Sequence, residues 1–363
     1  MKSKKLKFVS MVITFAMIVA LLPQDAYAYN VESINTMQTV SDESGSDSDA
    51  VLAYYDVETQ TETLLTEKDL QDTISNARKR NRSIGTTVEP QSAVEPHTIQ
   101  NLTEDEIEQF DEAADNTREY YGETASNMRA IDNRTLVSNP QADPYYRMAK
   151  LYYTQKTNAS GTTSGGYMGT GFAVGYNLCA TARHCITDDY GNWSTDFKAY
   201  YGYNGYNNTY CDLLDNVWGY IYYPQYITGK SSNGKIQVDM DYDIAFVIWG
   251  ERTVEETGCL GMSSEISNGM SLITAGYPGD RDNGYRMYRA AGNVTSFTNL
   301  RLKCDNIYCY PGQSGSAYYD AGLYAHGVIT HTDMLSNDVV SGESSGRRFD
   351  ATLIQWLQSN GYV

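Results

Sequence analysis

Residues 311–317 read Pro-Gly-Gln-Ser-Gly-Ser-Ala, and the interpretation of the whole chain starts from this stretch. Ser314 stands between glycines, which allow backbone conformations that other residues avoid, so that nearby N–H groups can point at one position. We expect the N–H groups of Gly312 and Ser314 to form an oxyanion hole, with Ser314 as the nucleophile. Because a serine hydroxyl is a poor nucleophile near neutral pH, the chain must also supply a base and an orienting carboxylate.

His184 is the predicted base. It directly follows a strand-like run in Ala180-Thr181-Ala182-Arg183-His184-Cys185. A side chain near the end of a strand can be held by a rigid scaffold while its ring faces a cleft. A core histidine bonded to a backbone carbonyl is the alternative interpretation.

Asp243 is the predicted carboxylate. It precedes the apolar run 244–249, where an aspartate can be partly buried and still bind an imidazole. With the aspartates at 239 and 241 it imitates the start of a calcium-binding EF-hand loop. However, positions 244 and 250, which need glycine and glutamate, hold isoleucine and glycine. We therefore predict no metal site and no cofactor. The order His184, Asp243, Ser314 is one of those in which Ser-His-Asp triads occur.

The N-terminus predicts export. Four lysines lie within residues 2–7, and an apolar run extends from Phe8 to Leu22. The sequence Ala26-Tyr27-Ala28, which follows this run, is typical of a signal-peptide cleavage site. Residues 1–28 are therefore predicted to be a secretory signal peptide, and we expect a secreted monomer with no membrane partner after its removal. The formal net charge is −18, and residues 29–129 contribute −15 of it (7 basic and 22 acidic), which makes nucleic acid an unexpected partner.

Two parts of the chain differ in composition. Residues 29–129 are acidic and lack cysteine; they show strand-like composition at 51–66 and a capping box, Thr103-Glu104-Asp105-Glu106, that predicts a helix over 103–121. We interpret them as a separate unit, a propeptide of mixed structure. Residues 130–363 predict an all-β barrel or sandwich with one terminal helix after Asp350. The strand predictions are 147–154, 169–176, 217–223, 244–249, 271–277, 292–297 and 323–330.

Residues 130–360 resemble the bacterial glutamyl endopeptidases, a branch of the chymotrypsin-like serine proteases. The matching motifs are Met168-Gly169-Thr170-Gly171-Phe172-Ala173-Val174-Gly175, Thr181-Ala182-Arg183-His184-Cys185, Ala275-Gly276-Tyr277-Pro278-Gly279-Asp280 and Gly312-Gln313-Ser314-Gly315-Ser316. The resemblance implies a double β-barrel with the triad in the cleft between the barrels. It also implies a secreted zymogen, with Arg129-Ala130 as the candidate junction, because Ala130-Ile131-Asp132-Asn133-Arg134-Thr135 is similar to the family's early mature sequence.

The resemblance further implies an endopeptidase that cuts protein or peptide substrates after Glu, with Asp second. His331 with Thr330 is the best match to the family's pocket histidine, with a shift of one residue, and His326 is its competitor. Cys309 stands where the family often has a pocket threonine. A protease of the same fold with another preference before the scissile bond therefore remains an alternative, as does a catalytically silent surface-binding relative.

The chain has six cysteines, all in its C-terminal part, and export makes disulfides chemically possible. Six cysteines allow 15 pairings, among which the sequence does not choose. In disulfide-bearing relatives the position after the base is paired, but the usual partner position is Gly169 in this chain. We therefore predict a non-standard partner for Cys185, with Cys179 and Cys211 the nearest in sequence.

Overall fold

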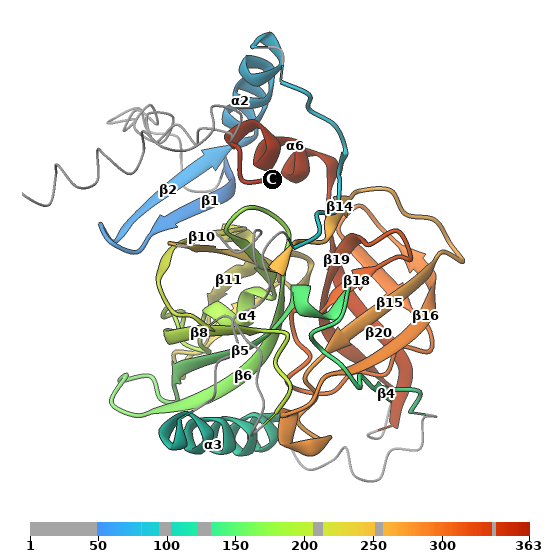
Figure 1. The fold of residues 1–363 in the computed structure, drawn as a ribbon. Helices are drawn as coiled ribbons and strands as arrows, with labels where there is room; N and C mark the ends of the chain where they lie inside the picture. The colour runs from blue at the N-terminus through green and yellow to red at the C-terminus, as the bar shows by residue number, and fades with distance from the viewer. Residues whose placement is uncertain are drawn as a thin grey trace, which may run out of the picture. The chain divides into compact units, whose positions relative to one another are not determined.

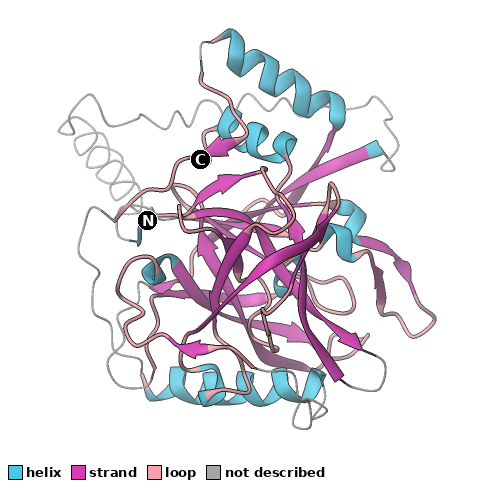
Figure 2. Ribbon diagram, turned by 90° about the vertical axis from the view of Figure 1, so that its right-hand side faces the viewer, coloured by secondary structure: helices cyan, strands magenta, loops and turns pink. Residues whose placement is uncertain are grey.

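The computed structural model describes residues 49–80, 82–93, 103–121, 132–205, 213–250, 257–335 and 339–363. The predicted signal peptide, the predicted junction Arg129-Ala130 and Cys211 lie outside these ranges. No helix within them has both the length and the apolar character that a bilayer span requires. Two large sheets dominate the described residues, and the longer helices lie at the periphery of the strands (Figures 1 and 2).

The first sheet has nine strands in the order β2-β1-β10-β13-β7-β6-β5-β8-β9. Strand β13, which overlaps the apolar run predicted at 244–249, lies between β10 and β7 in this sheet. It is buried along its whole length, as its apolar composition predicts. The bounds are β1 Ala50–Asp56, β2 Thr61–Thr66, β5 Met148–Lys156, β6 Ser164–Ala173, β7 Leu178–Thr181, β8 Thr195–Tyr201, β9 Leu213–Leu214, β10 Val217–Tyr222 and β13 Ala245–Trp249.

The second sheet also has nine strands, in the order β18-β15-β16-β17-β20-β19-β14-β3, with β4 paired to β16. Because β18 also pairs with β19, the strands from β18 to β19 in this order form a closed barrel without open edges, which we call the second barrel because it belongs to the second sheet. The bounds are β3 Thr87–Val88, β4 Thr135–Leu136, β14 Gly261–Ser263, β15 Ser271–Gly276, β16 Tyr288–Phe297, β17 Arg301–Cys304, β18 Ala317–Tyr319, β19 Tyr324–Leu335 and β20 Val339–Arg348.

The predicted all-β class and the predicted terminal helix are both confirmed. The seven predicted strand runs overlap β5, β6, β10, β13, β15, β16 and β19. Helix α6, Ala351–Asn360, begins where Oδ1 of Asp350 accepts a hydrogen bond of 2.8 Å from the N–H of Leu353. The remaining elements are a two-stranded sheet, β11 Ile227–Lys230 with β12 Ile236–Val238, the helices α2 Glu67–Lys79, α3 Glu104–Tyr121 and α4 Arg183–Ile186, and the 3₁₀ turns η5 Tyr145–Arg147, η6 Pro224–Tyr226, η7 Met240–Tyr242 and η8 Asp282–Gly284.

The described parts of the N-terminal segment pair and pack with elements of the rest of the chain. Strand β1 pairs with β10 and extends the first sheet, whereas β3 pairs with β14 in the second. Helix α2 packs beside α6 at one end of the strands, and α3 packs on β6 at the other (Figure 1). Composition alone could not predict these contacts, because strand pairing across the chain leaves no local signature in it.

Helix α3 confirms the predicted helix over 103–121. Its capping box is formed: the N–H of Glu106 donates to Oγ1 of Thr103, and the N–H of Thr103 donates to the Glu106 carboxylate. Phe110 inserts beneath the helix, edge-on to buried tyrosines at 152, 200, 203 and 285. It also covers the Lys150 ammonium, whose Nζ lies 4.2 Å from the ring centroid.

Lys150 is a buried cation that α3 closes off from water. Its Nζ donates a hydrogen bond of 2.9 Å to the carbonyl of Gly284 and contacts the rings of Tyr203 and Tyr285. Burial lowers the pKa of Lys150 to about 7, although the charge of Asp111 opposes this shift. In the unfolded chain Lys150 has the ordinary lysine pKa of about 10.5. Its burial therefore lowers the free energy of unfolding by the full amount below pH 7, and this loss shrinks as the pH rises from 7 to about 10.5.

We expect the free energy of unfolding of the full chain to rise between pH 7 and 9 by about 2 kcal/mol more than that of the same chain with Lys150→Met. Methionine keeps an apolar stem of similar length and removes the titrating group. Urea unfolding at each pH measures the difference. Parallel stability curves for the two chains would contradict the burial of an ionisable Lys150.

Candidate active site

Sheet pairing brings His184 and Asp243 together. Strands β7 and β13 are antiparallel neighbours with Thr181 opposite Ala245. The residue shortly after β7 and the residue shortly before β13 therefore lie at the same end of the sheet. His184 stands in the short helix α4, and Asp243 follows the turn η7.

The His184 imidazole and the Asp243 carboxylate form a direct contact. Nδ1 of His184 lies 2.8 Å from Oδ2 of Asp243, and the backbone N–H of His184 donates to Oδ1 at 3.0 Å. Asp243 is fully buried. Both of its carboxylate oxygens contact the same residue, His184, one through the backbone N–H and the other through Nδ1. An ionised carboxylate at Nδ1 places the ring proton on that atom and leaves Nε2 as the basic nitrogen.

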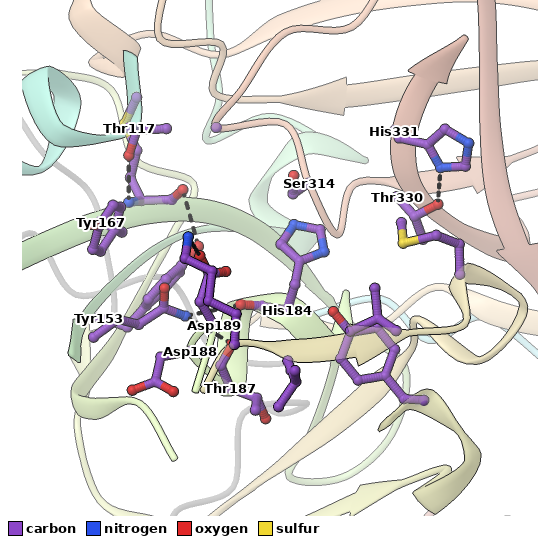
Figure 3. A pocket seen from close by; sticks show the side chains of 18 residues that line it. Thr117, Tyr153, Tyr167, His184, Thr187, Asp188, Asp189, Ser314, Thr330 and His331 are labelled. Atoms are coloured by element: carbon purple, nitrogen blue, oxygen red, sulfur yellow. Dashed lines mark hydrogen bonds and ion pairs between the residues drawn. The ribbon is translucent and has the colours of Figure 1, made fainter. Parts of the chain in front are cut away.

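Ser314 lies at a tight turn of the second barrel, in the same cavity as His184 (Figure 3). Its carbonyl accepts a hydrogen bond of 2.9 Å from the N–H of Thr170 on β6, which ties the turn to the first sheet. Gly312 and Gly315 have φ angles of +98° and +87°, and a Cβ at either position would lie within 2.4 Å of a backbone oxygen. Only glycine fits this turn, as the sequence predicted.

Two N–H groups of the turn remain available for an oxyanion. The N–H of Gln313 donates to the carbonyl of Tyr310, and that of Gly315 donates to the carbonyl of Ile329. Among the described residues, no backbone carbonyl accepts from the N–H of Gly312 or of Ser314. The two amides that the sequence predicted for an oxyanion hole are thus the two that the turn leaves without a backbone partner.

The cavity has a volume of about 440 Å³ and draws its lining from both sheets, from the β11–β12 hairpin and from α3. Ser314, His184, Thr330 and His331 all line it, and in Figure 3 the His184 ring is drawn just below Ser314 and the His331 ring, with Thr330, to the right of both. The hydroxyl of Thr330 lies 2.8 Å from Nδ1 of His331. These four predicted site residues are therefore brought together by the fold.

Two other residues considered from the sequence lie elsewhere. Cys309 does not line the cavity; it is buried in an apolar cluster of the second barrel with Leu272, Cys304 and Ile329. His326 does not line it either: its Nδ1 contacts the carbonyl of Glu265 at 2.7 Å, and its Nε2 lies 3.2 Å from Asp320. His326, the competitor of His331, is thus a buried histidine outside the cavity, in contact with a backbone carbonyl and a carboxylate.

The predicted bridge of Cys185 is wrong for its described candidate partner, because Cys185 and Cys179 are both free and buried. The Cys185 thiol approaches the carbonyl of Ser314 at 3.8 Å, whereas the Cys179 thiol approaches the carbonyl of Ala180 at 3.7 Å. Close packing of Cys185 beside Gly169 and of Cys179 beside Gly171 fills the space that each glycine leaves. Burial raises the pKa of Cys179 to about 12, which keeps it protonated.

Several side chains of the site carried no signal in the sequence. Gln155 on β5 holds the loop after His184 through hydrogen bonds to the carbonyls of His184 and Thr187. Lys235 on the β11–β12 hairpin lines the cavity and forms an ion pair of 2.6 Å with Asp189. Within the described ranges, no group of three or more His, Cys, Asp or Glu side chains is arranged to hold a metal ion.

Comparison with known proteins adds the following findings. No family model matches the chain. The chain is similar to a Glu endopeptidase. That structure, in complex with MPD, is 21% identical, covers 63% of this chain and 96% of its own length, and has a TM-score of 0.48.

Three further proteins are similar over comparable lengths. The protease Anisep from Arthrobacter nicotinovorans is 17% identical, covers 63% of this chain and all of its own, and has a TM-score of 0.45. The thermostable serine protease AL20 is 15% identical, covers 59% and 96%, and has a TM-score of 0.43. An extracellular metalloprotease of Bacillus subtilis (strain 168) is 26% identical over 215 residues, which are 57% of this chain and 63% of that protein.

Proposed function

We propose that this chain is the precursor of a secreted serine endopeptidase of the glutamyl endopeptidase family. The observation that carries the proposal is the buried Asp243 carboxylate, 2.8 Å from Nδ1 of His184, beside a cavity that also holds Ser314. A serine, an imidazole and a buried carboxylate at one cavity are the parts of a hydrolytic triad. The motifs around Ser314 and at Ala275–Asp280 support the family assignment.

In the proposed reaction, Oγ of Ser314 attacks the carbonyl carbon of the scissile bond while Nε2 of His184 takes the hydroxyl proton. The N–H groups of Gly312 and Ser314 stabilise the negative charge that develops on the carbonyl oxygen. His184 then gives its proton to the leaving amine as the C–N bond breaks, which leaves an acyl-enzyme. Water repeats the sequence with His184 as base, and Asp243 remains ionised throughout and stabilises the imidazolium.

One experiment distinguishes this proposal from metal-dependent hydrolysis, the activity that the name of the curated relative suggests. A fluorophosphonate should add covalently to Ser314 in the processed protein and abolish peptidase activity, whereas chelation by EDTA should leave the activity within twofold. Peptide mapping by mass spectrometry locates the adduct. Activity that survives the fluorophosphonate and disappears with EDTA would reject the serine mechanism.

The proposed substrate side chain before the scissile bond is glutamate, with aspartate second. A carboxylate in a cavity is costly unless donors compensate it. His331 and Thr330 are candidate donors because both line the cavity that contains Ser314, whereas Cys309 does not. This placement supports His331 as the main contact of the side chain.

We expect His331→Ala to lower kcat/KM for a peptide with Glu before the scissile bond by one to two powers of ten. The reason is the loss of a hydrogen bond to a charged group, about 1.5–3 kcal/mol. The matched peptide with Gln should lose less than threefold, and His326→Gln, outside the cavity, is the control variant. An unchanged Glu-to-Gln ratio in His331→Ala would assign the selectivity to another group.

Maturation is proposed to remove residues 29–129, with a cut between Arg129 and Ala130. Helix α3 of this segment occupies the edge of the cavity: Thr117 lines it, and its Oγ1 accepts a hydrogen bond of 3.2 Å from the N–H of Met168 on β6. The amide of Asn116 donates to the carbonyl of Gly166 on the same strand. A peptide that approached Ser314 along β6 would have to displace α3.

We expect secreted, active protein to begin at Ala130 and to react with a fluorophosphonate at least tenfold faster than the intact precursor, because α3 no longer narrows the cavity. N-terminal sequencing and labelling rates measure the two quantities. The precursor with Arg129→Gln should remain slow to react. A start far from residues 127–132, or equal labelling rates, would count against this maturation.

A further inference from the structure

Arg134, the residue directly before strand β4, lies in a cluster of side chains that reaches the loop of Ser314. Its side chain is 1% exposed. Nε and Nη2 donate to the carboxylate of Asp132 at 2.9 and 2.8 Å, and Nη1 and Nη2 donate to that of Asp280 at 2.8 and 2.5 Å. Nη1 also donates at 3.3 Å to Oε1 of Gln313, and the guanidinium lies 4.4 Å from the ring centroid of Tyr308. A planar fork with several donors matches this set of acceptors, which an ammonium could not.

The first route from Arg134 leads to the N–H of Ser314. Gln313 is fully buried, and its Oε1 accepts from the N–H of Tyr310 as well as from Arg134, so the side chain closes the loop on itself. The backbone carbonyl of Gln313 accepts from the N–H of Ser316 at 3.0 Å. Because a peptide unit is planar, fixing that carbonyl also fixes the direction of the N–H of Ser314.

The second route leads to the N–H of Gly312. The N–H of Gly279, next to Asp280 in sequence, donates to the carbonyl of Pro311 at 2.8 Å. That carbonyl belongs to the same peptide plane as the N–H of Gly312. Arg134 therefore contacts both segments that orient the two amides. It binds Asp280, beside the residue that fixes the N–H of Gly312, and Gln313, whose carbonyl fixes the N–H of Ser314.

We propose that Arg134 is a positioning residue for the oxyanion hole: it holds the 279–280 turn and the Gln313 side chain so that the N–H groups of Gly312 and Ser314 point at the developing oxyanion. This inference rests on the proposed function. Arg134 contacts neither substrate nor a reacting atom in this assignment. Its loss should therefore weaken the transition state and leave ground-state binding largely intact.

The molecule offers a matched control in Arg281. This arginine belongs to the same ionic cluster, since its Nη2 lies 2.6 Å from Oδ2 of Asp132, but its side chain is 48% exposed. No hydrogen bond from Arg281 reaches Gln313 among the described residues. Loss of Arg281 removes a charge from the cluster and leaves both routes to the amides in place.

The test compares Arg134→Met, Arg134→Lys and Arg281→Met in processed protein, on the peptide that the wild type cuts best. We expect Arg134→Met to lower kcat by 10- to 100-fold with KM within threefold, because displacing a hole donor should cost less than the 10²–10³ of removing one. Arg134→Lys should also lose at least tenfold. Arg281→Met should stay within threefold in both parameters. Circular dichroism and thermal unfolding show that each variant is folded at the assay temperature.

A second readout isolates the oxyanion. A peptide aldehyde with the same sequence forms a tetrahedral adduct whose oxygen occupies the hole, whereas the product acid of the same peptide does not form one. The affinity for the aldehyde should fall in step with kcat in both Arg134 variants, and the affinity for the product should change less than threefold. Equal losses for aldehyde and product, or an unchanged kcat in Arg134→Lys, would overturn the proposal. A wild type without peptidase activity would instead reject the proposed function itself.

Discussion

Ser314→Ala is expected to lower kcat/KM of the processed protein by about 10⁶, because alanine leaves no atom to form the acyl-enzyme. Among the described residues that line the cavity and follow the proposed cut, the two threonines lie elsewhere: Thr330 with His331, and Thr187 directly after α4. Alanine is smaller than serine and leaves the glycines of the turn unchanged, so the fold should be retained. Progress curves at high enzyme concentration, with the purified variant, measure the residual rate.

The control for this prediction is Ser316→Ala, two residues further along the same turn. Ser316 is fully buried, and its backbone N–H, which the substitution preserves, makes the hydrogen bond to Gln313. Its loss should change kcat/KM far less than the loss of Ser314. A Ser314→Ala variant with near-normal activity would reject the assignment of the nucleophile, whatever the behaviour of Ser316→Ala.

Asp243→Asn is expected to lower kcat by about 10⁴ near neutral pH. The asparagine is of nearly the same size, but its amide offers a donor as well as an acceptor to Nδ1 of His184, which lies 2.8 Å from the native carboxylate. The proton of the imidazole then moves to Nε2, the atom that must accept the proton of Ser314. The pH dependence of kcat/KM for the wild type and the variant measures the effect.

Two results would contradict the role of Asp243. One is a loss of less than tenfold at neutral pH. The other is an equal loss in Asp241→Asn, a nearby aspartate that is partly exposed and forms an ion pair with Arg301, whereas the contacts of His184 are to Asp243. The comparison separates the specific contact at Nδ1 from a general change of charge near the cavity.

The sequence predicted those cavity residues whose role can be recognised from their immediate neighbours in the chain. A serine between glycines, a histidine after a strand and an aspartate before an apolar strand each imply a role, and their order in the chain connects them. The structure adds the reason for their meeting: Thr181 pairs with Ala245, so the ends of β7 and β13 coincide. No local pattern states that register, because it depends on two strands that are far apart in the chain.

Contacts between distant segments account for what the sequence did not predict. Arg134 donates a hydrogen bond to Gln313, 179 positions further along the chain, and the residues around neither of them predict this contact. The bridge of Cys185 failed for a related reason: cysteine was interpreted by its chemistry, whereas here it fills space beside glycine. Likewise, the composition of residues 29–129 showed that they are acidic, but it could not show that β1 pairs with β10 in the first sheet and β3 with β14 in the second.

The pairing of β1 with β10 has a consequence for the lifetime of the proposed enzyme. Strand β10 lies between β13 and β1, so a chain that lacks residues 29–129 exposes one backbone edge of β10, next to the half-exposed Trp218. If residues 29–129 are removed as proposed, a molecule that later unfolds lacks the strand that pairs with this edge in the intact chain. Its survival outside the cell would then be governed by how fast it unfolds, because molecules that open would aggregate or be digested before they could return.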